Sequence, residues 1–382
     1  MARQTKKKVM LLMKKNNAYV LLFTLSIMTL ITVITLQLMR NVFVGSHFDK
    51  TMIHREHAEM LALGGVNLAI SQLTIKKDPK KDSTEESAEV KKTKQEKKLK
   101  EFLYKVLPHL NKWQVFELNE KHDGIDGEVK FCITSENGKI NINDAFDFKK
   151  KEFKPEYKKL LESLVINRKT PKGKVLKQLT DFFKKRKKKI YDVSQLQEAI
   201  PQLDSFFYEP PERTEKTKDA RPNPQVTLQD LFTVWASKIE PLFLSDASCA
   251  LFNLKRPIAY DAEKMKDRFK RVVDQFNPKI TANLNDYWNM LQTIYTKKPL
   301  NIEEYKNIFS SKFEPKVYSV LSSGKVGDVE QKLLAIIEKQ PEEAIKEKKN
   351  KKEEIVELKK EKEKNKKPLF LKHFKILKIY WL

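Results

Sequence analysis

The stretch AYVLLFTLSIMTLITVITLQL, residues 18–38, contains no charged residue, no proline and no glycine. A helix rises about 1.5 Å per residue, so one helix of this length can cross the roughly 30 Å hydrocarbon layer of a membrane. The apolar region of a cleaved secretory signal is shorter, and residues 37–40, QLMR, form a poor cleavage site. We therefore predict a retained membrane-spanning helix.

The charge before this stretch predicts its orientation. Residues 1–17 contain no acidic residue and six basic ones, which are Arg3, Lys6, Lys7, Lys8, Lys14 and Lys15. Positive charge favours the cytoplasmic side of a membrane. We expect a cytoplasmic N-terminus, a single span and one large region on the other side.

The composition argues against a nucleic-acid partner. The 382 residues include 76 Lys and Arg against 51 Asp and Glu, a formal net charge of +25. Such a charge is common in nucleic-acid-binding proteins. Here, however, lysine is mixed with glutamate in long runs, as in residues 91–101 and 346–367. Mixed runs are typical of solvated linkers and surface helices.

The sequence also lacks the common short motifs of active sites, including G-x-S-x-G, G-x-G-x-x-G, the P-loop and H-E-x-x-H. His54 and His57 lie one helical turn apart and are either metal ligands or a polar helix face. Residues 122–128, HDGIDGE, are either a calcium loop of unusual spacing or a polar turn. We favour the second reading of each, and we predict no catalytic residue, no metal site and no enzyme.

Helical spacing of apolar residues continues beyond the span, which predicts one helix from about residue 18 to 74, roughly 85 Å long. Gly64–Gly65 is its predicted bend. Small residues recur along one side and admit close packing against a sheet or another helix, or else belong to an ordinary core face. These residues are Ala58, Ala62, Gly65 and Ala69.

Two hairpins are predicted after a charged linker at 76–100 and a short helix at 99–110. In the first, Val129–Ile133 and Ile140–Ile142 alternate around Asn137–Gly138, a pair that accepts positive φ easily. In the second, residues 317–321 lead through Gly324 and Gly327 to a return strand at 333–337. A further short strand is expected at Val115–Phe116.

The region between the hairpins is expected to be mostly helical. Asp192 is a candidate helix cap, and the proline-rich residues 209–224 are an expected extended loop. Helices are predicted at 157–166, 175–183, 227–235, 245–254, 265–276, 284–295 and 302–309. The fold class is therefore α+β.

Three further features allow two readings each. Cys132 and Cys249 either form a disulfide or are small apolar core residues. Four aromatic residues in helical patterns are core residues rather than ligand platforms: Phe232, Trp235, Tyr287 and Trp288. The C-terminal LFLKHFKILKIYWL is basic and amphipathic, so it either lies on a membrane surface or is a frayed extension.

These pieces, in this order, resemble the K-type minor pseudopilins of bacterial type II secretion. The basic leader and apolar helix look like a prepilin leader and its span. Residues 138–145, GKININD followed by Ala145, look like the family's Gly-x-hydrophobic-Asn-hydrophobic-Asn signature, through Gly138, Asn141 and Asn143. Residues 226–234 and the hairpin at 317–337 are similar to later family segments, so that the resemblance covers about residues 10–340.

The resemblance implies a subunit at the tip of a secretion pseudopilus or related pilus-like filament. It implies processing by a prepilin peptidase between Asn17 and Ala18, although the family has glycine where Asn17 stands. Leu22 would then be the fifth mature residue, where major pseudopilins carry glutamate, and its lack of charge fits a tip position. The family's calcium ligands cannot be placed on this chain. Expected partners are other minor pseudopilins and inner-membrane secretion components. The residues expected to pack against neighbouring subunits of the filament are Leu22, Ala58, Ala62, Gly65 and Ala69.

The sequence pattern and the family resemblance together predict the layout of the chain. The parts are a leader (1–17), a transmembrane and pilin-type helix (18–75), a linker (76–100), the first part of a pilin-like α/β unit (101–148), an inserted helical domain (149–310), a closing hairpin (311–340) and a charged tail (341–382). The main domain would be periplasmic and the span would lie in the inner membrane. The alternative is a stand-alone single-span envelope scaffold or binding protein.

Overall fold

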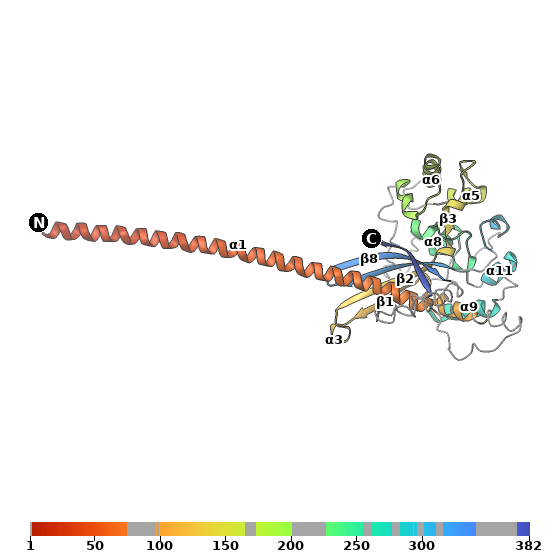
Figure 1. The fold of residues 1–382 in the computed structure, drawn as a ribbon, viewed down its shortest axis with the longest axis horizontal. Coiled ribbons are helices and arrows are strands. Elements are labelled where there is room, and N and C mark those ends of the chain that lie inside the picture. Colours follow the sequence, from red (N-terminus) through yellow and green to blue (C-terminus); the bar gives the residue numbers. More distant parts are fainter. Residues whose placement is uncertain are drawn as a thin grey trace, which may run out of the picture.

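The computed structural model describes residues 2–74, 97, 99–164, 173–200, 227–254, 262–276, 283–292, 294–295, 302–310, 316–340 and 373–382. One long helix leads into a head of strands and shorter helices (Figure 1). The long helix, α1, spans Ala2–Leu73 and is therefore about 108 Å long. It begins earlier than the predicted residue 18. The expected α+β fold with a long apolar N-terminal helix is confirmed.

The head contains a five-stranded antiparallel sheet against which the upper end of α1 packs. The sheet has two edge strands and three inner strands. The order across the sheet is β1 (Trp113–Leu118), β2 (Gly127–Ser135), β7 (Val317–Val326), β8 (Val329–Lys339) and β9 (Phe374–Trp381).

The predicted hairpin around Asn137–Gly138 is wrong. Strand β2 already pairs with β1 on one side and β7 on the other, so no returning strand can join it. Residues Glu136–Gly138 instead form a 3-10 turn. The next strand, β3 (Ile140–Asn141), pairs in parallel with β6 (Phe232–Thr233). Sequence alternation identified the strand residues but not their partners.

The predicted second hairpin is confirmed. Strands β7 and β8 pair along their whole length up to Val326 and Val329. The turn between them uses Gly327, whose φ of +57° favours glycine. A side chain at Gly327 would also approach His54 of α1. The hairpin therefore turns beside the long helix.

Residues 136–316 leave the sheet after β2 and return at β7. Asp192, Thr227 and Ser245 cap elements of this region by accepting backbone N–H groups. Most predicted helices are present here, but the helix predicted at 227–235 ends at Leu231, where the strand Phe232–Thr233 begins. The expected loop at residues 209–224 lies outside the described ranges. The helices are α5 (Pro155–Glu162), α6 (Lys174–Arg186), α7 (Leu228–Leu231), α8 (Asp246–Leu251), α9 (Ala262–Gln275) and α11 (Leu284–Leu291), with 3-10 turns at Val193–Glu198 and Ile302–Tyr305.

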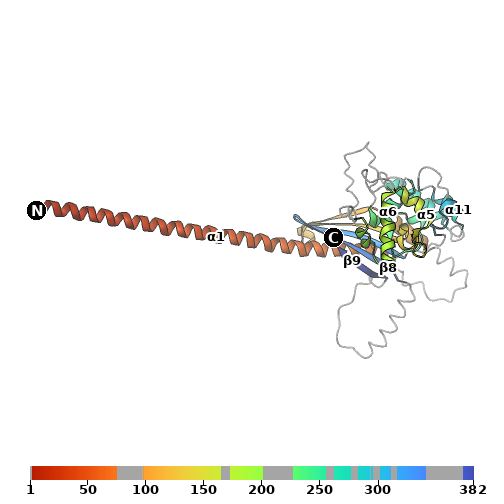
Figure 2. The ribbon, with the colours of Figure 1, turned by 90° about the horizontal axis from the view of Figure 1, so that it is seen from above.

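The C-terminal segment is not a frayed extension, and it is a strand rather than an amphipathic helix. Residues Phe374–Trp381 form β9, which pairs with β8 and ends the sheet. A register shift between Ile336 and Ile337 interrupts the pairing. This irregularity breaks the two-residue period of the strand, which is why the sequence resembles an amphipathic helix. The C-terminus therefore lies in the head (Figure 2).

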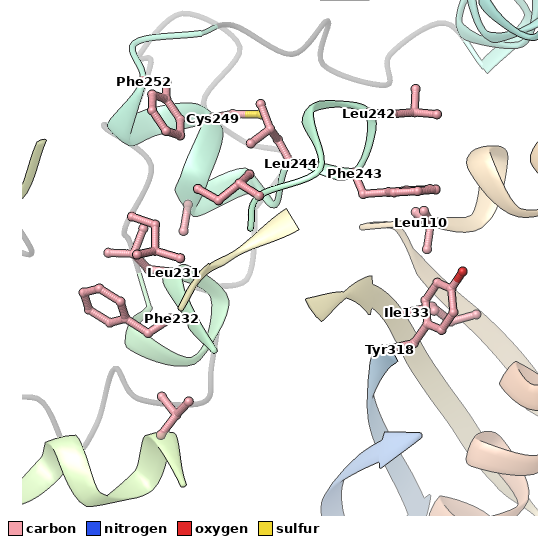
Figure 3. Close-up of a cluster of buried hydrophobic side chains, with 14 of the residues drawn as sticks. Leu110, Ile133, Leu231, Phe232, Leu242, Phe243, Leu244, Cys249, Phe252 and Tyr318 are labelled. Carbon is pink, nitrogen blue, oxygen red and sulfur yellow. The ribbon is translucent and has the colours of Figure 1, made fainter. Parts of the chain in front are cut away.

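A second part of the core joins the sheet to residues 136–316. Ile133 and Tyr318 of the sheet lie close to Leu110 and Phe243 (Figure 3), and all four are nearly or fully buried. The four aromatic residues also follow the prediction: Phe232, Tyr287 and Trp288 are buried, and Trp235 packs on the opposite side of the sheet. The sheet and this region share one apolar interior.

Candidate assembly surface

The small-residue stripe of α1 packs against the protein's own sheet. Ala58, Ala62 and Ala69 are fully buried, and a Cβ atom at Gly65 would lie 2.2 Å from Ser322 Oγ. Ser322 Oγ in turn donates a hydrogen bond of 2.8 Å to the Ala62 carbonyl. The predicted bend is not present at Gly64–Gly65, because α1 is continuous there and curves gently in Figure 1. Gly65 serves close approach to the sheet.

The sheet meets this stripe with its own glycine. A Cβ atom at Gly324 of β7 would lie 2.2 Å from the Ala58 carbonyl and 2.6 Å from the Ala62 nitrogen. A side chain at Gly324 would therefore collide with the backbone of α1. The four stripe residues are consequently covered within the chain and are not open to a neighbouring subunit.

The lower part of α1 is bare by contrast. Every residue from Leu22 to Ile53, which we call lower α1, is exposed. Among the described residues, α1 is the one helix long and apolar enough to cross a membrane. Hydroxyl groups in this part donate to carbonyls of their own helix, which leaves fewer polar groups to be hydrated. These donors are Ser26, Thr29, Thr32 and Thr35.

Apolar exposure continues past the uncharged stretch and toward the head. Large side chains between residues 42 and 53 are 43–69% exposed. They are Val42, Phe43, Val44, Phe48, Met52 and Ile53. An exposed apolar run of this size marks a contact with lipid or protein. Lower α1 is therefore the candidate assembly surface, and Leu22, 66% exposed, belongs to it.

The residues of the predicted family motif have structural positions inside the head. A Cβ atom at Gly138 would lie 1.7 Å from the Phe243 carbonyl oxygen. Asn141 caps α4 (Ile142–Ala145) and donates to the Ala236 carbonyl at 2.7 Å. Asn143 exchanges two hydrogen bonds with the backbone of Ile190. The motif thus fixes where residues 136–316 leave the sheet.

Asn17 and Ala18, the predicted processing residues, lie within the helical run of α1. Their side chains are outside the described set.

Three buried ionisable residues lie beside this junction: Glu136, Lys139 and Glu240. Lys139 Nζ is 2.5 Å from Glu136 Oε1 and donates to Ser319 Oγ at 3.0 Å. Burial raises the pKa of the Glu240 carboxyl to about 8, although a hydrogen bond from Tyr287 partly opposes this. Glu240 is therefore largely protonated at neutral pH. Sequence reasoning did not predict the burial of these three residues, although Lys139 lies within the motif at residues 138–145.

The candidate ligand positions do not converge. Asp123 and Asp126 accept backbone N–H groups of Asn119 and Glu120, so residues 122–128 form a capped turn. Within the described ranges, no group of three or more His, Cys, Asp or Glu residues could hold a metal ion.

The two cysteines lie in different parts of the head. No disulfide joins Cys132 and Cys249. Cys249 is buried, as the second reading of the sequence proposed, and Cys132 is half-buried. Burial, together with the charges of Asp230 and Asp246, raises the pKa of the Cys132 thiol to about 12.

The two edges of the sheet differ. Edge strand β1 exposes Trp113, Val115 and Phe116. Edge strand β9 is fastened instead: Lys378 Nζ and Tyr380 OH both donate to Asp192 Oδ2. These bonds lower the pKa of Asp192 against the opposing effect of burial. We call these three residues the Asp192 clasp. Sequence reasoning missed the clasp because it joins positions far apart in the chain.

Comparison with known proteins adds no relative. No known protein family matches the chain, and no curated protein matches it. The resemblance to the K-type pseudopilins therefore depends on the quoted motifs alone.

Proposed function

We propose that this protein is a membrane-anchored assembly subunit similar to a K-type minor pseudopilin. It would act at the tip of a type II secretion pseudopilus or a related pilus-like filament. The observation that carries the proposal is the division of α1: the upper helix is covered by the protein's own sheet, and lower α1 is bare from Leu22 to Ile53. Such a helix can pack its lower part against helices of neighbouring subunits.

The exposed apolar residues at 42–53 favour subunit partners over lipid alone. Residues 42–53 lie beyond the uncharged stretch 18–38, and charged residues are interspersed there and just before: Arg40, Asp49 and Lys50. A helix of about 20 residues already crosses the hydrocarbon layer. The apolar residues beyond it would face water unless another protein covers them. Neighbouring long helices are the partners that this geometry fits.

The proposed setting is the bacterial inner membrane, with the N-terminus in the cytoplasm and the head in the periplasm. The basic residues before the span support this orientation. Leu22 supports a tip position, because a subunit with no neighbour above it needs no buried carboxylate there. The alternative, a stand-alone scaffold protein, would use the basic C-terminal segment on a membrane surface, but this segment is the edge strand β9 of the head.

Co-purification from native membranes tests the proposal. The tagged full-length chain is expected to recover pilin-like partners. Phe48→Glu, at a residue 63% exposed on lower α1, should abolish this recovery while leaving the chain in the membrane. Tyr191→Ser, at a residue 78% exposed on the head, is the matched control and should leave recovery unchanged. Recovery of no pilin-like partner by the unaltered chain would contradict the proposal.

The mass of the mature N-terminus tests processing separately. A chain that starts at Ala18 would support cleavage by a prepilin peptidase. A chain that keeps residues 1–17 would show that Asn17 prevents this cleavage, and a start beyond residue 38 would remove the anchor.

A further inference from the structure

Two runs of basic residues in the head begin beside the same cluster of aromatic rings. Residues 149–151, KKK, lie in the turn that joins the paired residues Asp147 and Glu152. Residues 184–189, KKRKKK, cover the end of α6 and the three residues after it. The rings that precede the two runs, Phe148 and Phe183, pack edge to face with their centroids 5.8 Å apart. The two runs therefore belong to one surface, which we call the lysine patch: Lys149, Lys150, Lys151, Lys184, Lys185, Arg186, Lys187, Lys188 and Lys189.

The lysine patch carries charge that the head does not balance. Residues 147–152 and 181–189 contain nine basic residues against three acidic ones. All eight lysines are exposed, and none of them forms an ion pair with a residue in the described ranges. Elsewhere on the head, carboxylates lie 2.8 Å from Lys130 Nζ and 2.7 Å from Lys159 Nζ. A lysine-rich composition therefore does not by itself account for the patch, whose like charges repel one another.

Local structure explains only part of the patch. Basic residues in the last turn of α6 complement the helix dipole, and this accounts for Lys184, Lys185 and Arg186. Lys151 and Lys187, however, each have a φ of +58°, where a Cβ atom is unfavourable. The other non-glycine residues with positive φ in the described ranges are asparagines, which tolerate this geometry. An external partner accounts for lysine at these two positions better than the backbone does.

The chemistry of the patch favours an anionic lipid surface. Lysine presents a compact point charge and does not select one ligand shape as the planar fork of arginine does. Tyr191 follows the patch and is 78% exposed, and such rings lie at the headgroup level of membranes. Single-stranded nucleic acid would need several free ring faces for its bases. Phe182 instead lies 5.7 Å below the Arg186 guanidinium, and Phe148 packs against Phe183.

The head is held too far from the predicted span for the anchoring membrane to attract the patch. The sheet packs on α1 from Ala58 onward, and the roughly 20 residues between Leu38 and Ala58 are about 30 Å of helix. Charges are screened within about 8–10 Å at physiological ionic strength. We propose that the lysine patch binds the anionic headgroups of a second membrane, so that the protein holds two bilayers together. This inference requires no filament partner and does not rest on the proposed function.

Recruitment between two vesicle populations tests the proposal with the full-length chain. The protein is reconstituted into phosphatidylcholine vesicles, and fluorescent vesicles of equal parts phosphatidylglycerol and phosphatidylcholine are added. We expect the fluorescent vesicles to bind, and binding to weaken as salt rises, because salt screens the lysines. Fluorescent vesicles of phosphatidylcholine alone should bind at least about tenfold less. Equal recruitment of both kinds of vesicle would overturn the proposal.

A charge reversal in each run locates the interaction. Lys150→Glu combined with Lys188→Glu changes two exposed side chains and should lower recruitment at least about tenfold. Lys112→Glu combined with Lys121→Glu makes the same change of net charge at exposed positions on either side of β1, across the head from α6 in Figure 1. This control should recruit vesicles as the unaltered chain does. Equal losses in the two double variants would show that net charge alone matters and would disprove the patch.

A soluble polyanion separates lipid from nucleic acid as the partner. A single-stranded oligonucleotide is titrated against the reconstituted protein and against the variant with Lys150→Glu and Lys188→Glu. Oligonucleotide binding that this variant loses, without recruitment of anionic vesicles by the unaltered chain, would assign the patch to nucleic acid and overturn the lipid proposal. Pilin-like partners are measured by co-purification, so failure of one proposal does not imply failure of the other.

Discussion

Lower α1 and upper α1 belong to one helix but are built for different neighbours. Lower α1, Leu22–Ile53, presents large apolar side chains on all sides, and every one is exposed. Upper α1, Ala58–Leu73, places alanine and glycine residues against Gly324 and Ser322 of the sheet. Large exposed side chains leave the choice of neighbour open, whereas the small ones permit one close contact within the chain. The following experiments separate the two parts.

The largest expected effect is on lower α1. Ile31→Glu places a carboxylate in the middle of the apolar stretch, where a charge costs about 2.5–3.5 kcal/mol in membrane insertion. We expect the membrane-inserted fraction of the chain to fall while the head keeps its thermal stability. Fractionation and circular dichroism of the released protein measure the two parts separately. An unchanged inserted fraction would contradict a span centred on Ile31.

The second effect concerns the head and depends on pH. The pKa of Glu240 is about 8 in the folded protein and near 4.3 in an unfolded chain. Between these values the folded state binds more protons, so stability falls as pH rises from about 4.3 to 8, by a few kcal/mol at most. Asp230, whose pKa burial raises to about 6, contributes to the lower part of this range.

Glu240→Gln keeps an acceptor for Tyr287 and removes the titration. We expect the loss of stability between pH 6 and 8 to shrink in this variant, with little change near pH 5. Thermal melts over this pH range measure it. An unchanged slope would show that Glu240 does not titrate there. Membrane association through lower α1 should not depend on pH in this range.

The two glycines of upper α1 provide a matched pair. Gly65→Ala would place its Cβ atom 2.2 Å from Ser322 Oγ and 3.0 Å from Val129, and overpacking of this kind costs about 1–3 kcal/mol. Gly64→Ala meets nothing within 4 Å and should stabilise the helix by about 0.5–1 kcal/mol. Denaturant melts should therefore shift in opposite directions. Equal shifts would mean that the helix does not pack as described.

The smallest effect is expected from one hydrogen bond. Ser322→Ala removes the bond to the Ala62 carbonyl, which should cost about 1 kcal/mol. In the Gly65→Ala background the same change should relieve the clash, so the double variant should be more stable than the sum of the two predicts. If the losses of stability in the two single variants simply added in the double variant, Ser322 and Gly65 would not be in contact.

Features that depend on local chemistry could be predicted from the sequence. The apolar stretch, the hairpin closed by Gly327, and the cap at Asp192 are local patterns, and the structure confirms them. Pairing across long distances could not be predicted. The alternation on both sides of Asn137–Gly138 is real, but the partner of β2 is β7, which follows almost two hundred residues later.

For the candidate assembly surface too, local features could be predicted and long-range contacts could not. The uncharged stretch that contains Leu22 could be found because lipid-facing helices have a composition of their own. The small residues Ala58, Ala62, Gly65 and Ala69 indicated a close contact, but their expected role in filament packing is wrong, because the sequence could not decide between the chain's own sheet and another helix. The Asp192 clasp had no local signal, since the register shift beside β9 hides the strand period.

The insertion of residues 136–316 between neighbouring strands has a consequence during synthesis. Strand β2 leaves the ribosome about 180 residues before β7, and at 5–20 residues per second this gap lasts roughly 10–35 s. Throughout it, Phe131 and Ile133 have no finished sheet to cover them, although the apolar anchor has already emerged. The newly made head therefore exposes part of its apolar interior until the strands that complete the sheet have been made.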